Sequence, residues 1–439
     1  MSSHVDQLQI SLASGPVSAR QLAENMGVSQ PTVSRVIAMA GDAIVRIGAA
    51  RSIQYALRDT SRGFAEIPVY RVSTEGKLRR LGILVPVRPD GFVMRQDDGR
   101  TLYSEGLPWW LLDMRPQGFL GRAWAARHGA ALGLPNSIKD WSDSHALRAL
   151  LVHGHDVVGN LILGDIAYGN FVDAPMPESI SRDLFPHMAD TAERGDIAGS
   201  SAGGEQPKFA AYVDGRHALV KFTAHEDNSV TQRWRDLLLA EHHALQTLLK
   251  HGVGAPASQV TDIGGRRFLE VERFDRVGAT GRRALHSLAS LDAEFVGLGN
   301  AAWPETVVQL CRSEVVTSDA QTHTATLYAF GTLIGNTDMH SGNVSFVAEH
   351  GRPYTPAPAY DMLPMAFAPR SGGVIVNEIP AASLNPSVSV GIWRNAAKMA
   401  EDYVRRLETD PRFSESWEPC LAALRQHIYA AMTKIQKLD

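Results

Sequence analysis

Near residue 340, a short loop gathers side chains that could take part in phosphoryl transfer. The sequence IGNTDMHSGNVSF (334–346) places Asp338, His340 and Asn343 between a predicted helix at 325–333 and a predicted strand. In phosphoryl-transfer sites an Asp can accept the proton of the substrate hydroxyl, and an Asn five positions later can hold Mg²⁺. Asp338 and Asn343 have this spacing. Considered alone, the loop could equally be an Asx-rich turn whose side chains only satisfy the backbone.

A second acidic residue follows at the distance that such a site needs. The stretch VSFVAEHGRPYTPAPAYDMLP (344–364) predicts a hairpin that Asp361 closes. Because Mg²⁺ prefers hard oxygen ligands, Asn343 and Asp361 are the candidate metal ligands. His340 is not needed as a ligand and is expected to touch phosphate or to shape the loop. With Asp361 in place, the reading as a simple turn becomes the weaker one.

A glycine-rich stretch supplies a possible phosphate cradle. In GSSAGGEQPKFAAYVDGRHALVKFT (199–223), small residues at 199–204 let successive backbone N–H groups approach an anion. The stretch is not a Walker A loop, because no Gly-Lys-Ser/Thr leads into a helix. Lys221 alternates with apolar residues on a predicted strand, so it should be partly buried and need a partner. Glu241, in the predicted helix 234–253, is that partner; the alternative is a flexible loop followed by a surface lysine.

The first sixty residues contain a helix-turn-helix pattern. VSARQLAENMGVSQPTVSRVIAMAG (17–41) predicts two helices, the first with a Ser18–Gln21 capping box and a stop at Gly27, the second capped by Ser29. Two strand-like runs around a Gly-Ala-Ala turn follow in IVRIGAARSIQYAL (44–57) and predict a wing. The candidate DNA-binding residues are Gln30, Thr32, Ser34 and Arg35 on the second helix, and Arg46 and Arg51 on the wing.

The charge of this region favours DNA binding only modestly. Up to Arg58 there are five Arg, no Lys and three acidic residues, whereas phosphate contact normally uses a larger surplus. A small helical domain used for protein contacts is the alternative.

The middle of the chain predicts a β-rich subdomain without catalytic residues. From about Ile67 the apolar pattern has a period of two, and turn signals break 69–99 into the strands of a β-meander. Helices are predicted around 119–132 and 143–153. Trp109 and Trp110 are expected in the core. This segment is expected to pack or to orient a substrate.

Bulk composition excludes several classes of protein. The 439 residues carry a net charge of −4, so any nucleic-acid site must be local. Two cysteines, Cys311 and Cys420, cannot form a disulfide scaffold or a zinc cluster, which suits a reducing cytosol. No signal peptide and no apolar run of about 18 residues is present. We therefore expect a cytoplasmic protein that does not enter membranes.

Five motifs in this order resemble the HipA family of bacterial toxin serine/threonine kinases. They are SAGGEQPKF, ALVKF, VERFDR (271–276), GNTDMHSGN and AYDMLP, and they cover roughly 190–370. The middle stretch, ending in GHDVVGNLIL (154–163), also looks like the N-terminal subdomain of that family. Each motif is weak alone, whereas their shared order and spacing are specific.

The resemblance implies a role for each matched residue. Asp338 would be the catalytic base, Lys221 would bind phosphate, Glu241 would support it, and Asn343 and Asp361 would hold Mg²⁺. Glu272 and Phe274 would meet adenine through their backbone. Ser201, or the adjacent Ser200, would be autophosphorylated. The ATP-binding residues would be Gly203, Gly204, Glu205, Gln206, Pro207, Lys208, Lys221, Glu272, Arg273, Phe274, His340, Ser341, Gly342, Asn343, Tyr360 and Asp361.

The expected fold class is α+β: a two-lobed, protein-kinase-like body with an N-terminal β-rich subdomain and an N-terminal winged helix-turn-helix. The expected boundaries are 1–58 for the DNA-binding-like module, 59–185 for the β-rich subdomain, 186–275 for the small lobe and 276–439 for the large, mostly helical lobe. One departure from the family matters, because its toxins usually pair with a separate DNA-binding antitoxin, whereas this chain carries its own module.

The expected function is an ATP- and Mg²⁺-dependent serine/threonine protein kinase that acts as a growth-inhibiting toxin. Its partners would be a protein substrate, DNA through residues 1–58, and a second copy of the chain if it reads paired half-sites. Family substrates include aminoacyl-tRNA synthetases, but no residue here selects one. The alternatives are a nucleotide-sensing transcription regulator with weak or no kinase activity and a small-molecule phosphotransferase.

Overall fold

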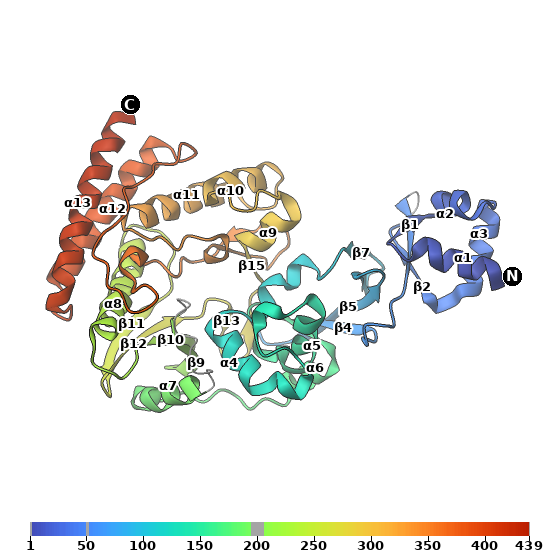
Figure 1. The fold of residues 1–439 in the computed structure, drawn as a ribbon, viewed down its shortest axis with the longest axis horizontal. Helices are drawn as coiled ribbons and strands as arrows, with labels where there is room; N and C mark the ends of the chain where they lie inside the picture. The colour runs from blue at the N-terminus through green and yellow to red at the C-terminus, as the bar shows by residue number, and fades with distance from the viewer. Residues whose placement is uncertain (1, 50–51, 195–205, 439) are drawn as a thin grey trace. The chain divides into compact units, whose positions relative to one another are not determined.

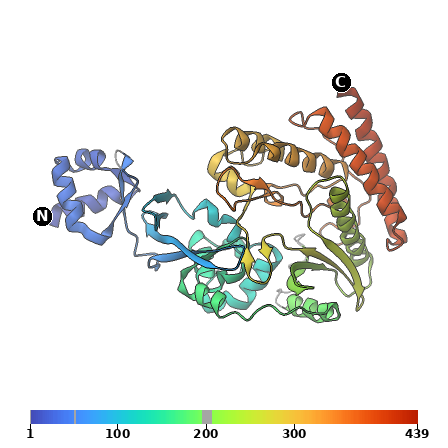
Figure 2. The ribbon, with the colours of Figure 1, turned by 180° about the vertical axis from the view of Figure 1, so that it is seen from behind.

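The computed structural model describes residues 2–49, 52–194 and 206–438, and they form two compact units. Unit 1 comprises Met1–Ser73, Lys77–Arg115 and Lys139–Ala174, and unit 2 comprises Thr74–Gly76, Pro116–Ile138 and Pro175–Asp439. Figure 1 labels the helices and strands, and Figure 2 gives the view from behind. None of the described helices is both long enough and apolar enough to cross a membrane.

Unit 1 opens with three helices: α1 (Ser2–Leu12), α2 (Ala19–Met26) and α3 (Gln30–Ala40). The Ser18–Gln21 capping box is present at α2, and Gly27 ends α2 at φ 64°, as predicted. Ser29 precedes α3, but its hydroxyl pairs with Thr32 Oγ1 at 3.0 Å and caps no backbone N–H, so the expected Ser29 cap is wrong. Helix α1 was not predicted. Its Leu8 and Leu12 are fully buried in one core with α2 and α3.

A three-stranded sheet in the order β1-β3-β2 follows, built from β1 (Val17–Ser18), β2 (Ile44–Ile47) and β3 (Gln54–Leu57). One face of the β2–β3 hairpin packs on the helical core through Ile44, Tyr55 and Leu57. Its other face is also covered, since buried Val45, Ile47 and Ala56 share a second core with β-rich residues of unit 1. The predicted hairpin is therefore present, and it is held on both faces.

The predicted β-meander is confirmed as a five-stranded antiparallel sheet in the order β7-β6-β5-β4-β8. Helices α5 (Asp143–His153) and α6 (Gly164–Val172) pack beside it. Trp109 and Trp110 lie on a 3₁₀ helix (Trp109–Met114) and are half-buried, with Trp110 against the core of the sheet. The strands are β4 (Ile67–Val72), β5 (Leu78–Val87), β6 (Gly91–Gln96), β7 (Thr101–Ser104) and β8 (Leu161–Leu163).

Unit 2 contains a four-stranded antiparallel sheet in the order β11-β12-β10-β9. Its strands are β9 (Lys208–Val213), β10 (Arg216–Phe222), β11 (Ser258–Ile263) and β12 (Arg266–Glu272). Helix α8 (Ser229–Lys250) lies along β11 and β12 in both Figure 1 and Figure 2. It starts five residues before the predicted 234, because the Asn228 side chain caps it by accepting from the Thr231 N–H at 2.9 Å. Two further helices, α4 (Gly118–His128) and α7 (Phe185–Arg194), pack against β9.

The rest of unit 2 is mostly helical. Helix α11 packs between α10 and α12, and α12 packs against α13. A small sheet has the order β15-β16-β17, and β13 pairs with β14. The helices are α9 (Leu288–Phe295), α10 (Trp303–Arg312), α11 (Ser318–Leu333), α12 (Val390–Thr409) and α13 (Glu418–Ile435). The short strands are β13 (Arg276–Val277), β14 (Gly281–Arg282), β15 (Leu285–Ser287), β16 (Ser345–Val347) and β17 (Thr355–Pro356).

Candidate functional site

Lys221 is the centre of a buried ion cluster. It lies on β10 between the buried residues Val220 and Phe222 and is itself 5% exposed. Its Nζ donates to Glu241 Oε1 at 2.6 Å and to Asp361 Oδ1. Strand alternation turns Lys221 inward, and Glu241, 2% exposed in the middle of α8, meets it there. One ammonium thus joins a strand, a helix and the segment after β17.

The electrostatics of this cluster keep Lys221 and Asp361 ionised. Burial alone would lower the pKa of Lys221, but attraction to Asp361 and Glu241 outweighs burial and raises it. Burial opposes ionisation of Asp361 as well, yet Lys221 and Lys208 lower the pKa of Asp361 to about 2. The pKa of Glu241 is raised, mainly because its burial outweighs the pull of Lys221. Asp361 is also the accessible carboxylate of the cluster, since 36% of its side chain is exposed compared with 2% for Glu241.

A single buried asparagine ties Asp361 to the loop that carries Asp338. Asn336 is 4% exposed, its Oδ1 accepts the Asp338 N–H at 3.0 Å, and its Nδ2 donates to the Asp361 backbone oxygen at 3.3 Å. Asp361 itself adopts φ 52°, an uncommon backbone conformation for a residue other than glycine. Asn336 is not among the residues predicted from the sequence. Its position two residues before Asp338 in a polar loop was the signal that could have identified it.

The loop around Asp338 is shaped by its own side chains. Asn343 Nδ2 donates to the Asp338 backbone oxygen at 2.8 Å, which leaves Asn343 Oδ1 for another partner. His340 Nδ1 accepts the Gly342 N–H at 3.0 Å, so His340 caps the short turn Ser341–Asn343. Tyr360 donates its hydroxyl to the Gly342 backbone oxygen at 2.7 Å. Asp338 and His340 are exposed, as a group that must reach a substrate has to be.

The glycine-rich loop is described only from Gln206 onward. Gly203, Gly204, Glu205, Ser200 and Ser201 lie outside the described residues. Gln206 Nε2 donates to the Phe222 backbone oxygen, and the Phe222 N–H donates to the Pro207 oxygen at 3.0 Å. Lys208 stands directly opposite Lys221 in the β9–β10 ladder. Two lysines therefore flank the place where this loop joins the sheet.

The segment expected to meet adenine begins at Glu272, the last residue of β12. The Glu272 N–H donates to the Ala257 oxygen at 2.9 Å, and the Arg273 N–H donates to the His217 oxygen at 2.8 Å. These two N–H groups are occupied within the fold, so neither is free to bind a base. The Phe274 ring lies 5.8 Å from the Tyr360 ring, centroid to centroid. Phe274 thus contacts Tyr360, whose hydroxyl bonds the loop of Asp338 at Gly342.

Unit 1 holds the residues predicted to contact DNA. Gln30, Ser34 and Arg35 are exposed on α3, and Thr32 is half-buried. Arg35 Nη2 donates to Thr32 Oγ1 at 3.3 Å. Arg46 is exposed on β2, whereas Arg51 lies outside the described residues. Gln30, Ser34, Arg35 and Arg46 are therefore accessible to solvent.

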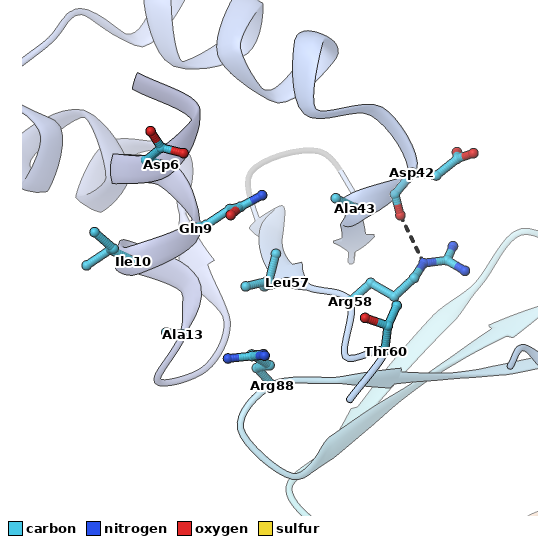
Figure 3. A pocket seen from close by; sticks show the side chains of 10 residues that line it. All are labelled: Asp6, Gln9, Ile10, Ala13, Asp42, Ala43, Leu57, Arg58, Thr60 and Arg88. Carbon is cyan, nitrogen blue, oxygen red and sulfur yellow. Dashed lines mark hydrogen bonds between the residues drawn. The ribbon is translucent and has the colours of Figure 1, made fainter. Parts of the chain in front are cut away.

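A pocket of about 630 Å³ lies in unit 1 and contains none of the predicted catalytic residues (Figure 3). Both acidic and basic side chains line it, and Arg58 in its wall donates to the Asp42 backbone oxygen at 2.9 Å. Its lining residues are Asp6, Gln9, Ile10, Ala13, Asp42, Ala43, Leu57, Arg58, Thr60 and Arg88. Arg58 is also bound to Glu66 at 2.9 Å, so its charge is already compensated.

Two family models and one relative of known name match this chain. Residues 200–428 match the family described as HipA-like C-terminal domain, and residues 64–172 match the one described as YjjJ-like toxin, middle domain. The chain is 37% identical over 437 residues to Toxin YjjJ of Escherichia coli (strain K12), covering 97% of this chain and 98% of that protein.

Among solved structures, the chain resembles one from the Shewanella oneidensis MR-1 toxin–antitoxin complex of HipA, HipB and operator DNA. The TM-score is 0.56 at 16% identity, and the match covers 85% of this chain and 99% of that chain. At this identity the similarity establishes the fold: mixed helix and sheet, resembling HipA.

Proposed function

This chain belongs to the HipA-type toxin family, and on that premise we propose that it is an ATP- and Mg²⁺-dependent serine/threonine protein kinase that inhibits growth. The observation that carries the proposal is the junction of Lys221 with Glu241 and Asp361, linked through Asn336 to the loop of Asp338. A strand lysine, a helix glutamate and two acidic groups in these roles are the parts that a phosphoryl-transfer site requires.

The residues fit the groups that such a reaction needs. Asn343 Oδ1 and the Asp361 carboxylate are hard oxygen donors, which suit Mg²⁺. When bound, Mg²⁺ would neutralise charge on the nucleotide phosphates. Lys221, held as an ammonium by its two carboxylates, would bind phosphate oxygens. Asp338 would accept the proton of the attacking hydroxyl, and Asn336 and Asn343 would fix the backbone on either side of it.

We assign the remaining nucleotide contacts by family membership. Phe274 and Tyr360 would border adenine, and the loop containing Gly203, Gly204 and Lys208 would line the phosphates. Autophosphorylation at Ser201 or Ser200 would put negative charge beside those phosphates and weaken nucleotide binding, which is a simple way to switch the enzyme off.

We also propose that residues 1–58 bind DNA. The exposed polar side chains of α3 are those that a recognition helix presents to the major groove. The similar HipA structure contains HipB and operator DNA, whereas this chain carries a DNA-binding-like module of its own. A fused module would bring the kinase to its operator without a separate antitoxin.

Purified protein incubated with Mg-ATP and analysed by mass spectrometry tests the kinase. We expect phosphate on Ser201 or Ser200 in the parent chain and a loss on the order of 10²–10⁴-fold in the Asp338→Asn variant, because the general base is removed. Asp319→Asn, an exposed acidic residue at the start of α11, is the matched control and should leave the rate unchanged.

The same assay separates the alternatives. ATP turnover only when a sugar or antibiotic is added would identify a small-molecule phosphotransferase. Nucleotide binding without turnover would identify a sensor. If Asp338→Asn inhibits growth and labels protein as well as the parent chain does, the kinase proposal fails.

A further inference from the structure

Arg233 holds the segment that follows Asp361, and we propose that it is a positioning residue for the Mg²⁺-binding carboxylate. Arg233 lies on α8 and is 2% exposed. Its Nη1 donates to the Phe367 backbone oxygen at 3.1 Å and to the Val376 backbone oxygen at 2.9 Å, and its Nη2 donates to Asn377 Oδ1 at 2.7 Å. The inference rests on the proposed kinase function, because it concerns the metal site of that reaction.

The guanidinium closes the base of a loop. Phe367 and Val376 lie at the two ends of 367–376, and the loop folds back on itself through the Arg370 N–H, which donates to the Val374 oxygen at 3.0 Å. Because a planar guanidinium presents several N–H groups in a fixed fork, it can hold both ends at once. A lysine at this position would carry the charge without that geometry.

Arg233 has no carboxylate partner among the described residues. Its positive charge is stabilised by hydrogen bonds to carbonyl and amide oxygens and by the Trp417 ring, whose centroid lies 5.6 Å from the guanidinium carbon. Burying a cation in this way is costly unless its hydrogen bonds are kept. Breaking the hydrogen bonds between Arg233 and the loop would therefore leave a buried cation without acceptors, which is costly.

Phe367, where Arg233 binds, lies six residues after Asp361, and backbone hydrogen bonds hold this stretch at several points. Between them, the Phe367 N–H donates to the Pro364 oxygen and the Met365 N–H to the Leu363 oxygen, which makes a tight turn. The Ala366 N–H donates to the Gly335 oxygen at 3.0 Å, beside Asn336. A displacement of the Phe367 backbone would therefore also shift the backbone at Asp361 and in the loop of Asp338.

Helix α8 thus fixes Asp361 from two sides. Glu241 holds it through Lys221, and Arg233, eight residues earlier on the same helix, holds the backbone that follows it. Eight helical residues span about 12 Å, so the two anchors are well separated.

The test is calorimetric titration of a non-hydrolysable ATP analogue at increasing Mg²⁺ concentrations, for the full chain and two variants. For Arg233→Lys and Arg233→Met, we expect the Mg²⁺ concentration at half-maximal effect to rise at least about tenfold, as when a group supporting a metal ligand is lost. Binding of the analogue without Mg²⁺ should stay within about twofold, because Lys221 and Glu241 are untouched.

Arg235→Met is the matched control. Arg235 lies two residues along on α8 and is bound to Asp227, Gln232 and the Gly265 backbone oxygen, away from the 367–377 loop. It should leave the Mg²⁺ requirement unchanged. A purely structural role for Arg233 would lower the fraction of binding-competent protein, seen as a lower stoichiometry, without shifting the Mg²⁺ midpoint.

The outcomes are distinguishable. A parent chain that does not bind the analogue with Mg²⁺ overturns the proposed function and this inference with it. A parent chain that binds normally, with an Arg233→Lys variant of unchanged Mg²⁺ midpoint, overturns only the role of Arg233.

Discussion

Lys221 joins two carboxylates that come from different elements of unit 2. Two carboxylates share its ammonium, and the net charge of the three groups is compensated by Lys208 on the neighbouring strand. Such a buried pair contributes little net stability, since desolvation offsets the attraction, but breaking it is costly. The main effect of the cluster is therefore to fix the relative positions of β10, α8 and the segment of Asp361.

Replacement of Asn336 should lower the rate of phosphotransfer. In Asn336→Ala, Asp338 and Asp361 lose their shared hydrogen-bonding partner. We expect phosphotransfer to fall on the order of tenfold or more, because a small misplacement of a catalytic group is enough to do so. Steady-state kinetics measure this. Thr337→Ala, at the exposed neighbouring position, is the control; equal rates in Asn336→Ala and the parent chain would contradict the assignment.

Local chemistry explains which parts of the site could be predicted from the sequence. The Lys221–Glu241 pair follows from strand alternation and helix periodicity, and both partners lie within 20 residues of each other. Asp361 reaches Lys221 across 140 residues, and no local pattern encodes that contact. The bonds from the Glu272 N–H to Ala257 and from the Arg273 N–H to His217 form only once the sheet is formed, so no local pattern encodes them either.

A helix end could be predicted from the sequence where a nearby side chain caps the first turn of the helix. The Ser18–Gln21 capping box was predictable from four residues. Helix α1 was not, because its Leu8 and Leu12 are buried only by packing against α2 and α3. The second face of the β2–β3 hairpin was missed too, since the residues that cover it lie some forty positions later, at Val85, Val87 and Val93.

The two helix caps of unit 1 should differ in strength. Ser18→Ala should destabilise unit 1 by about 1 kcal/mol, because the Gln21 N–H loses its acceptor. Ser29→Ala should cost less, about 0.5 kcal/mol or below, because the Ser29 hydroxyl bonds only Thr32 in an exposed position. Thermal unfolding monitored by circular dichroism compares them. Equal losses for the two variants would show that Ser29 caps α3 in solution.

DNA binding by α3 can be tested without knowing the operator. Arg35→Ala should weaken binding to a non-specific duplex severalfold and reduce the salt dependence by about one counterion. Fluorescence anisotropy across a salt series measures both quantities. Arg80→Ala is the control, because Arg80 lies on the meander and is paired with Asp97 at 2.9 Å. An unchanged salt slope in Arg35→Ala would remove α3 from the proposed interface.

Four histidines that are buried or half-buried make the stability of the fold depend on pH. Burial, together with the neighbouring His243 and Arg412, lowers the pKa of His242 from 6.5 to about 4. Burial also lowers the pKa values of His243, His323 and His427. In the unfolded chain these groups take up protons below about pH 6.5, whereas the folded chain resists. Their contribution is therefore complete above pH 6.5 and is lost as the pH falls towards 4.

We expect the free energy of unfolding at pH 5 to be lower than at pH 7.5, with His242 alone accounting for roughly 2 kcal/mol of the difference. Urea unfolding at the two pH values measures it. His242→Gln can still bond Ser258 but cannot titrate, so it should have a smaller pH effect than the parent chain. A variant with the full pH effect would show that His242 does not titrate on unfolding.

A crystal structure of the full chain with Mg²⁺ and a non-hydrolysable ATP analogue tests the central claim most directly. We predict phosphate oxygens at Lys221 and a Mg²⁺ ion bound by Asn343 and Asp361, with Asp338 facing the terminal phosphate. A nucleotide bound elsewhere, or a metal that contacts neither Asn343 nor Asp361, would contradict the account.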